Sequence, residues 1–268
     1  MNKTQFIAEV SSNHGGNMAL AKEFIRIAAQ VGVDYVKFQS WQVARLADGP
    51  KDPQYDWLVK AELTDAMHRE LMEECAKQGV KFLTAVFDIH RVDFLASLGL
   101  KEIKVPSPNL SSYRMLEALR NKFEHVILST GMHEEAEIRQ AAEVLKGSRF
   151  TFMHCVAVYP AGPETANLAR MDWLRQFTTS VGYSDHVVGL DAAKVAIARG
   201  AAYVERHFSL GKYGPGRSNV WDTTPEQMEE LVKYAERVHG LLGDGSLSLG
   251  EAERKSRERF LHRWGNDG

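Results

Sequence analysis

Several features that would place the chain in a special class are scarce or missing. Only two of its 268 residues are cysteines, Cys75 and Cys155, so neither a disulfide-stapled domain nor a cysteine-based zinc site is expected. No apolar run approaches the roughly 20 residues needed to span a bilayer, and the N-terminus has no room for a signal peptide. The formal net charge is −2, with lysine and arginine scattered along the chain, which provides no basic face for nucleic acid. We therefore expect a soluble, cytoplasmic protein with no nucleic-acid or membrane partner.

What is present is a regular alternation of short apolar segments with longer amphipathic ones. Hydrophobic residues make up 44% of the chain and charged residues 25%, which is ordinary for a globular protein. Eight strand-like segments alternate with eight segments of helical periodicity. This pattern predicts the α/β class, with a single-domain TIM (β/α)8 barrel at residues 1–243 and a C-terminal helical tail at 244–268. The predicted strands are 6–10, 35–39, 81–87, 102–105, 125–129, 150–156, 181–186 and 201–208, and the predicted helices are 18–30, 64–78, 90–98, 112–121, 133–146, 168–177, 189–200 and 225–242.

The segment 181–208 shows the strand–helix–strand pattern most clearly, and each of its strands carries a histidine near its end. The first strand closes on His186, and the second carries Glu205 and His207, which share one face because strand side chains alternate. The carboxyl ends of parallel strands meet at one rim, which in α/β barrels holds the active site. Imidazoles beside carboxylates suit a divalent ion such as manganese or zinc, and two histidines leave positions open for water or substrate. The alternative is that each histidine is a hydrogen-bonded structural residue.

Polar residues also lie at the carboxyl ends of most other predicted strands. Burying such groups unpaired costs several kcal/mol each, so their repetition indicates a function. Lys37 and Lys104, with Ser107, Ser129 and Ser184, predict a pocket for a phosphate or carboxylate. For either lysine alone, the alternative is that its stem runs along the barrel and its charge reaches the rim. The complete strand-end set is Glu9, Lys37, Gln39, Lys104, Ser129, Ser184, Glu205 and His207.

The segments at these strand ends together resemble the barrel domain of the sialic acid synthases. Those enzymes condense phosphoenolpyruvate with an amino-sugar aldehyde to make nine-carbon ulosonic acids. The similarity covers roughly residues 5–264. Each motif alone is a weak match, but together they occur in the same order as in the family. The matching segments are 8–16 (AEVSSNHGG), 36–39 (VKFQ), 128–132 (LSTGM), 154–155 (HC) with 159–160 (YP), 182–186 (GYSDH) and 204–208 (VERHF).

The resemblance implies a role for each matching residue. It makes His186 and His207 the ligands of a divalent metal, Mn2+ in this family, and it places Glu9 at the reacting carbons. The implied reaction is attack of enol carbon 3 on a polarised aldehyde, addition of water at carbon 2 and loss of phosphate. The remaining positions are assigned to the two substrates: Lys37, Lys104 and Ser107 to the phosphate, Ser129 and Ser184 to the carboxylate, and Gln39 and Tyr159 to the sugar.

Four positions depart from the family pattern. Ala85 stands where the family has a threonine that helps to hold the phosphate, and Asn109 stands where it has an acid. Ala157 stands where the family has an asparagine, and Ser218 where it has a sugar-binding aspartate. The family's C-terminal antifreeze-like domain is also missing, and the last residues resemble the linker that leads into it. We therefore predict a phosphoenolpyruvate-dependent synthase whose acceptor differs from N-acetylmannosamine. The alternative is a repurposed barrel, acting as a lyase or isomerase on a related acid or as a ligand-binding partner subunit.

The segment 40–60 is predicted to be a long, irregular loop rich in aromatic residues. Its Trp41, Tyr55 and Trp57 are candidates to cover the barrel mouth and stack on the acceptor, with packing against the rim as the alternative. A second copy of the chain or a separately encoded antifreeze-like protein is the expected macromolecular partner.

Overall fold

The computed structural model describes residues 3–211 and 214–265, whose eight strands close into one parallel barrel. Each strand pairs in parallel with the next, and β8 pairs with β1, which closes the sheet. The predicted TIM barrel is therefore confirmed. In chain order the strands are β1 (Gln5–Glu9), β2 (Tyr35–Ser40), β3 (Lys81–Val86), β4 (Glu102–Val105), β5 (His125–Ser129), β6 (Phe150–Cys155), β7 (Val181–Asp185) and β8 (Tyr203–His207).

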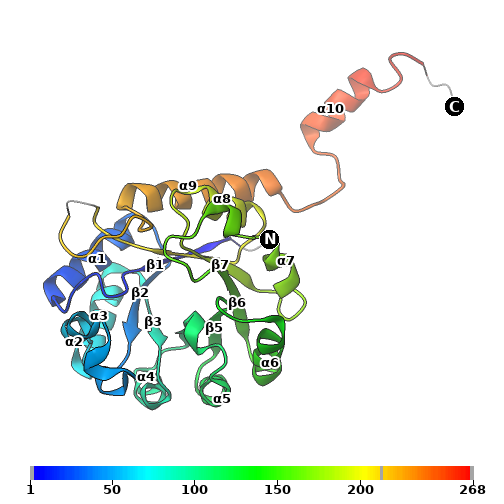
Figure 1. Cartoon of the computed structure of the whole chain (residues 1–268). Coiled ribbons are helices and arrows are strands. Elements are labelled where there is room, and N and C mark those ends of the chain that lie inside the picture. Colours follow the sequence, from blue (N-terminus) through cyan, green and yellow to red (C-terminus); the bar gives the residue numbers. More distant parts are fainter. Residues whose placement is uncertain (1–2, 212–213, 266–268) are drawn as a thin grey trace.

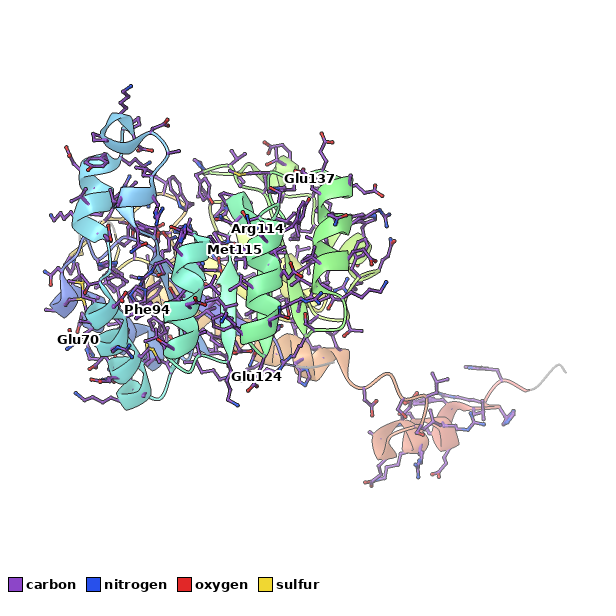
Figure 2. The ribbon with its side chains drawn as sticks, turned by 90° about the horizontal axis from the view of Figure 1, so that it is seen from below. Glu70, Phe94, Arg114, Met115, Glu124 and Glu137 are labelled. Atoms are coloured by element: carbon purple, nitrogen blue, oxygen red, sulfur yellow. The ribbon has the colours of Figure 1, made fainter. Side chains whose placement is uncertain are left out.

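Helices surround the barrel and connect successive strands (Figure 1). Phe94 on α4, Arg114 and Met115 on α5 and Glu137 on α6 mark three neighbouring helices of this outer ring in Figure 2. The α-helices are α1 (Met18–Gln30), α2 (Tyr55–Ala61), α3 (Asp65–Gln78), α4 (Val92–Ser97), α5 (Tyr113–Lys122), α6 (Glu135–Leu145), α7 (Arg170–Leu174), α8 (Asp191–Ala198), α9 (Pro225–Leu242) and α10 (Glu251–Phe260). The short 3-10 helices are η1 (Val43–Arg45), η2 (Gly49–Lys51), η3 (Ile89–Arg91), η4 (Ser107–Asn109) and η5 (Pro163–Thr165).

Most predicted boundaries lie close to the observed ones, and the exceptions have local causes. The bounds of α1, β4, β5 and α9 are as predicted. The loop predicted over 40–60 is wrong, because this segment folds into η1, η2 and most of α2. The helix predicted over 90–98 begins as η3, where the Asp88 side chain accepts from the His90 N–H at 2.8 Å, and continues as α4. The helices α7 and α10 are shorter than predicted.

Strand side chains alternate between two separate hydrophobic layers. On β1, for example, Phe6 and Ala8 belong to the layer between the strands and the helices. The other layer fills the interior of the barrel. Both layers follow from the two-residue period of a strand, which sends successive side chains to opposite faces. The interior layer consists of Ile7, Tyr35, Leu83, Ile127, Met153 and Tyr203.

The same period determines what lies above the interior layer, toward the carboxyl ends of the strands. Two residues beyond Ile7 on β1 and Tyr35 on β2 come Glu9 and Lys37, which face the same side as their apolar predecessors. Glu205 repeats the pattern on β8. These three side chains are buried, with 1%, 3% and 6% of their surface exposed. The barrel interior therefore carries a charged layer directly above an apolar one.

The chain beyond α9 extends away from the barrel. Helix α9 ends at Leu242, and α10, which has no buried residue, projects away from the barrel in Figures 1 and 2. The division into a barrel at 1–243 and a tail at 244–268 stays a prediction. None of the described helices has both the length and the apolar character needed to cross a membrane.

Gly182 on β7 marks a tight point of the barrel interior. An added methyl group would run into the Met153 sulfur and come within 2.8 Å of the Tyr203 carbonyl oxygen. We expect Gly182→Ala to lower the free energy of unfolding by about 1–3 kcal/mol through overpacking, as measured by urea denaturation. The matched control is Gly240→Ala in α9, where no atom of the described residues lies within 4 Å of the added carbon. It should raise stability by about 0.5–1 kcal/mol. Equal effects of the two substitutions would contradict this packing.

Candidate active site

Lys37 lies between two buried carboxylates at the carboxyl end of the barrel interior. Its Nζ is 3.0 Å from Oε2 of Glu9 and 3.1 Å from Oε1 of Glu205. The Gln39 Nε2 group donates to the other oxygen of Glu9 at 2.6 Å, and the Ser184 hydroxyl donates to Glu205 Oε1 at 3.2 Å. Strands β1, β2, β7 and β8 thus contribute to one connected cluster.

The two acids share a lysine, but their pKa values are shifted in opposite directions. Burial raises the pKa of Glu9 to about 7, against the attraction of Lys37. Burial also acts to raise the pKa of Glu205, but Lys104 and Lys37 outweigh it and lower that pKa to about 2. Burial acts to lower the pKa of Lys37, but Glu205 and Glu9 outweigh it and raise that pKa above its ordinary value. Glu9 is therefore the member of the cluster that can exchange a proton near neutral pH.

Lys104 provides the second positive charge of this layer. Its ammonium group donates to the Ser129 hydroxyl oxygen at 2.6 Å. Burial lowers the pKa of Lys104 to about 8, against the attraction of Glu205. Ser107 follows β4 and accepts from the Gly131 backbone N–H at 3.1 Å, which ties the ends of β4 and β5 together. Ammonium and hydroxyl groups held on neighbouring strands suit an anionic ligand.

His186 and His207 lie side by side at the ends of β7 and β8, and Tyr159 packs against them. The two imidazole centroids are 5.4 Å apart, and the Tyr159 ring is 4.1 Å from that of His186. Burial lowers the pKa of His186. Burial, with His186 and Lys37 adding to it, lowers the pKa of His207 to about 3. Both imidazoles are therefore neutral at physiological pH, which is the form that binds metals.

The two histidines fit an open site for a divalent ion. The Nδ1 atom of His186 is 2.9 Å from the Val156 carbonyl oxygen. Because a carbonyl only accepts, Nδ1 carries the proton and Nε2 keeps its lone pair, as is usual for a metal-binding histidine. Within residues 3–211 and 214–265, no three side chains of His, Cys, Asp or Glu converge on one point. An ion held by this pair would therefore keep positions open for water or substrate.

Asp185 directly precedes His186, but its carboxylate is committed to a structural pair. It forms a buried ion pair with Arg206 and accepts from the Tyr183 hydroxyl at 3.0 Å. The Arg206 guanidinium also donates to the Thr223 hydroxyl. Asp185 therefore fixes the ends of β7 and β8 against each other and is not available to a metal.

Trp221 and Cys155 also lie at this site. Periodicity gives no signal for either, although Cys155 stands in segment 154–155, which matches the family pattern. Trp221 is in the segment after β8, and its ring is 5.7 Å from that of Tyr159, so it supports the aromatic side of the site. The Cys155 sulfur, at the end of β6, is 3.9 Å from His186 Nδ1, and burial raises the pKa of this thiol. Both contacts join segments that are distant in sequence, which periodicity and spacing do not predict.

The positions that depart from the family pattern lie in four different strands or the segments that follow them. Ala85 is fully buried on β3, and Ala157 follows β6. Asn109 ends η4 after β4. Ser218 lies after β8, with its hydroxyl 3.1 Å from that of Ser209.

The aromatic residues of segment 40–60 divide between two places instead of forming one cover. The Trp57 indole donates to the Ser12 hydroxyl at 2.9 Å, over the segment between β1 and α1. Trp41 packs edge-on against Phe87 with ring centroids 5.9 Å apart. Tyr55 is the first residue of α2.

A closed parallel barrel with buried lysines, carboxylates and histidines at the carboxyl ends of its strands defines an α/β-barrel enzyme with a site for an anionic substrate. The chain belongs to the NeuB family, whose profile matches residues 24–247. It is 34% identical to N,N'-diacetyllegionaminic acid synthase of Campylobacter jejuni, over 96% of this chain and 82% of that one. It is 33% identical to the protein of the same name from Legionella pneumophila, over 89% of this chain and 73% of that one. The crystal structure of N-acetylneuraminic acid (sialic acid) synthetase from Leptospira borgpetersenii in complex with citrate has a TM-score of 0.91 and 29% identity, covering 98% of this chain and 93% of that one.

These comparisons confirm the predicted sialic acid synthase family and the predicted class of enzyme, a synthase that joins phosphoenolpyruvate to an aldehyde sugar. The family uses a divalent metal, which agrees with the two neutral histidines. The acceptor's identity beyond this class, the identity of the metal and the role of each site residue stay predictions. So does an association with a second copy or with an antifreeze-like partner.

We expect the chelator-treated protein to bind one divalent ion, and His186→Ala and His207→Ala each to weaken that binding. Losing a ligand should cost more than about 10-fold in affinity, since even the supporting contacts of metal ligands are worth 10–100-fold. Titration calorimetry with Mn2+ measures this without requiring activity. The matched control is His239→Ala on the exposed side of α9, which should bind like the unsubstituted protein. Unchanged affinity in both site variants would show that the histidines are structural.

Proposed function

We propose that this chain condenses phosphoenolpyruvate with an aldehyde sugar that carries two acylamino groups, in preference to N-acetylmannosamine. The observation that carries the proposal is the charged layer, in which Lys37 and Lys104 lie buried with Glu9, whose pKa is about 7. The acceptor class comes from the two relatives named for a diacetylated product, N,N'-diacetyllegionaminic acid. The uncharged Asn109, where the family has an acid, supports an acceptor with amide groups over one rich in hydroxyls.

The charged layer explains how a strongly anionic substrate enters a buried site. Two lysines face two glutamates there, so the cluster is close to neutral before the substrate binds. The substrate phosphate competes with Glu9 and Glu205 for Lys37, and its negative charge raises the pKa of Glu9 further. Glu9 then takes up a proton, which lets Lys37 turn to the phosphate without leaving an unpaired carboxylate. The proposed contacts are Lys37, Lys104 and Ser107 to the phosphate, and Ser129 and Ser184 to the carboxylate.

His186 and His207 would hold the metal, and Mn2+ is the proposed ion because imidazole together with oxygen ligands suits it. When bound, the ion supplies Lewis-acid polarisation of the aldehyde oxygen. The neutral state of both imidazoles supports this assignment.

The chain's own groups orient the acceptor and move protons. Carbon 3 of the enol bonds to the aldehyde carbon, whose oxygen takes the proton held by Glu9 and becomes a hydroxyl. A water molecule then adds at carbon 2 and gives a proton to the Glu9 carboxylate formed in the first step. The bond from carbon 2 to the phosphate oxygen breaks, and the leaving phosphate takes the proton of the carbon 2 hydroxyl, which becomes a carbonyl. Gln39 holds Glu9 in place through its 2.6 Å hydrogen bond, and the half-exposed Tyr159 faces the sugar. The proposed catalytic set is thus Glu9 with the metal-binding His186 and His207.

Phosphate release from phosphoenolpyruvate, measured with Mn2+ across a panel of aldehydes, tests the proposal. We expect turnover with a hexose aldehyde carrying two acetamido groups and at least about 10-fold lower kcat/KM with N-acetylmannosamine, since a missing hydrogen-bonding group leaves site groups unpaired. Product analysis by carbon NMR should show the new carbon–carbon bond. Comparable turnover of N-acetylmannosamine would overturn the acceptor assignment. Binding of phosphoenolpyruvate without consumption by any aldehyde would instead support a ligand-binding partner subunit.

A further inference from the structure

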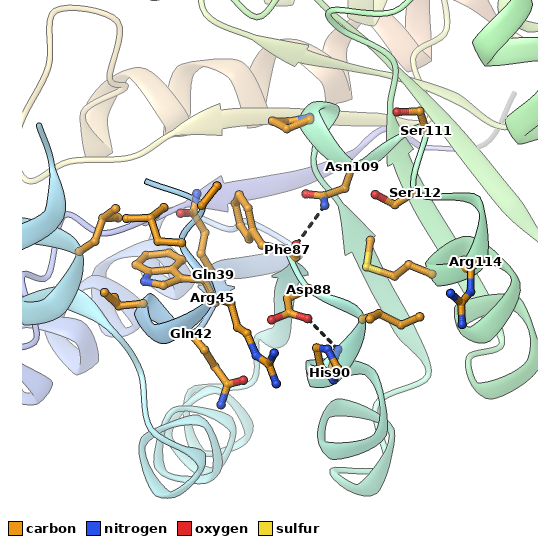
Figure 3. Close-up of a pocket in the computed structure, with 18 of the residues that line it drawn as sticks. Gln39, Gln42, Arg45, Phe87, Asp88, His90, Asn109, Ser111, Ser112 and Arg114 are labelled. Carbon is orange, nitrogen blue, oxygen red and sulfur yellow. Dashed lines mark hydrogen bonds between the residues drawn. The ribbon is translucent and has the colours of Figure 1, made fainter. Parts of the chain in front are cut away.

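A cavity of about 1190 Å³ lies beside the barrel mouth, between the segments that follow β2, β3 and β4. Figure 3 shows it with Gln39, Gln42 and Arg45 on one side and Asn109 and Ser112 on the other. Its volume is that of a site for a small organic molecule. Most of the side chains that line it are apolar, among them Trp41, Leu46, Phe87, Ile89, Tyr113 and Met115.

The cavity opens directly on the charged layer. Gln39 lines the cavity while its Nε2 group donates to Glu9 Oε1 at 2.6 Å. Asn109 lines it from the opposite side, where its amide N–H donates to the Phe87 carbonyl oxygen at 3.0 Å and leaves the amide oxygen free to accept (Figure 3). A sugar whose aldehyde carbon lies near Glu9 therefore has its remaining carbons next to this space.

Two buried polar atoms of the cavity residues have no hydrogen-bond partner within residues 3–211 and 214–265. One is a donor, the indole Nε1 of Trp41, and the other an acceptor, Oδ2 of Asp88. The other carboxylate oxygen of Asp88 already accepts from the His90 N–H at 2.8 Å. Leaving buried polar groups unpaired is costly, so they indicate a missing partner. A secondary amide supplies both an N–H for a carboxylate and a carbonyl oxygen for an indole.

The apolar walls of the cavity favour an acceptor with an acylamino group over an acceptor with a phosphate group. A methyl group attached to an amide suits the surfaces of Phe87 and Met115. A phosphate would have to shed its hydration against the same surfaces and beside the Asp88 carboxylate, which is costly. The cationic Arg45 and Arg114 are exposed, and Figure 3 shows Arg114 at the edge of the cavity farthest from Gln39.

We propose that this cavity binds an acylamino substituent on the acceptor carbons far from the aldehyde, with Asp88 and Trp41 as its hydrogen-bond partners. The inference rests on the proposed condensation and deepens it, because it identifies the residues that distinguish a diacylated acceptor from a monoacylated one. Asp88, Trp41 and the cavity wall are specificity determinants, and none of them belongs to the charged layer.

The test uses alditols, made by reducing the aldehyde of each acceptor, because they bind without reacting. Titration calorimetry in the presence of phosphoenolpyruvate and Mn2+ compares a diacetamido alditol with a monoacetamido alditol and its phosphate ester. We expect the diacetamido compound to bind at least tenfold more tightly than either of the others. Asp88→Asn retains an oxygen for the His90 N–H but replaces the unpaired acceptor by a donor, and it should weaken diacetamido binding about tenfold.

A second variant blocks the space without touching hydrogen-bonding groups. Ile89→Trp, at a position with 39% of its surface exposed, should remove the preference for the diacetamido compound. Its matched control is Val195→Trp on α8, a residue 48% exposed and outside the cavity, which should keep the preference. Thermal melting verifies that each variant is folded.

The outcomes separate this inference from the reaction on which it rests. Equal binding of the mono- and diacetamido alditols, or full preference retained in both Asp88→Asn and Ile89→Trp, overturns the cavity assignment even when phosphate is released. Tighter binding of the phosphate ester also overturns it, in favour of an anion site at the arginines. Absence of phosphate release with every aldehyde refutes the proposed reaction, whatever the alditols show.

Discussion

The site depends on one ammonium group shared between two carboxylates inside a closed barrel. Lys37 is 3.0 Å from Glu9 and 3.1 Å from Glu205, and all three side chains are buried. Removing Lys37 takes this partner from both buried carboxylates, and breaking a buried ion pair typically costs about 3–5 kcal/mol. The second lysine, Lys104, acts mainly on one of the two acids. It lowers the pKa of Glu205, which stays ionised, while the pKa of Glu9 is about 7. The cluster that holds these strand ends together is thus also the one that can exchange an internal ion pair for a substrate anion.

The barrel holds this cluster in place by elementary strand geometry. Glu9, Lys37 and Glu205 each stand two positions beyond an interior apolar residue, so the layer that fills the barrel also supports the layer above it. The buried pair of Asp185 with Arg206 locks β7 to β8, and these two strands present His186 and His207. The residues proposed to carry the chemistry and the residues that fix the strands against each other are therefore different residues of the same strands. In α/β barrels the framework is commonly kept while the loops that carry the chemistry vary.

The barrel, and the polar residues that stand at the carboxyl ends of its strands, were predictable from the sequence because both obey short-range rules. Helix α1 has an apolar stripe and a side-chain cap at Asn17, and its bounds were predicted without error. The segment 40–60 has neither signal: the residue before α2 makes no side-chain cap hydrogen bond, so this helix depends on tertiary contacts. Strand alternation likewise indicated which polar residues face inward, but not their partners. That Asp185 turns to Arg206, that Trp221 joins Tyr159, and that a cavity opens beside Gln39 all depend on segments brought together only by the fold.

A crystal structure of the protein with phosphoenolpyruvate tests the central claim most directly. The account predicts the phosphate within hydrogen-bonding distance of Lys37 Nζ, Lys104 Nζ and Ser107 Oγ, with the Lys37–Glu9 contact lengthened from 3.0 Å. The substrate carboxylate should lie at Ser129 and Ser184. Phosphoenolpyruvate bound away from both lysines, with the Lys37 ion pairs intact, would contradict the claim that this charged layer is the substrate site.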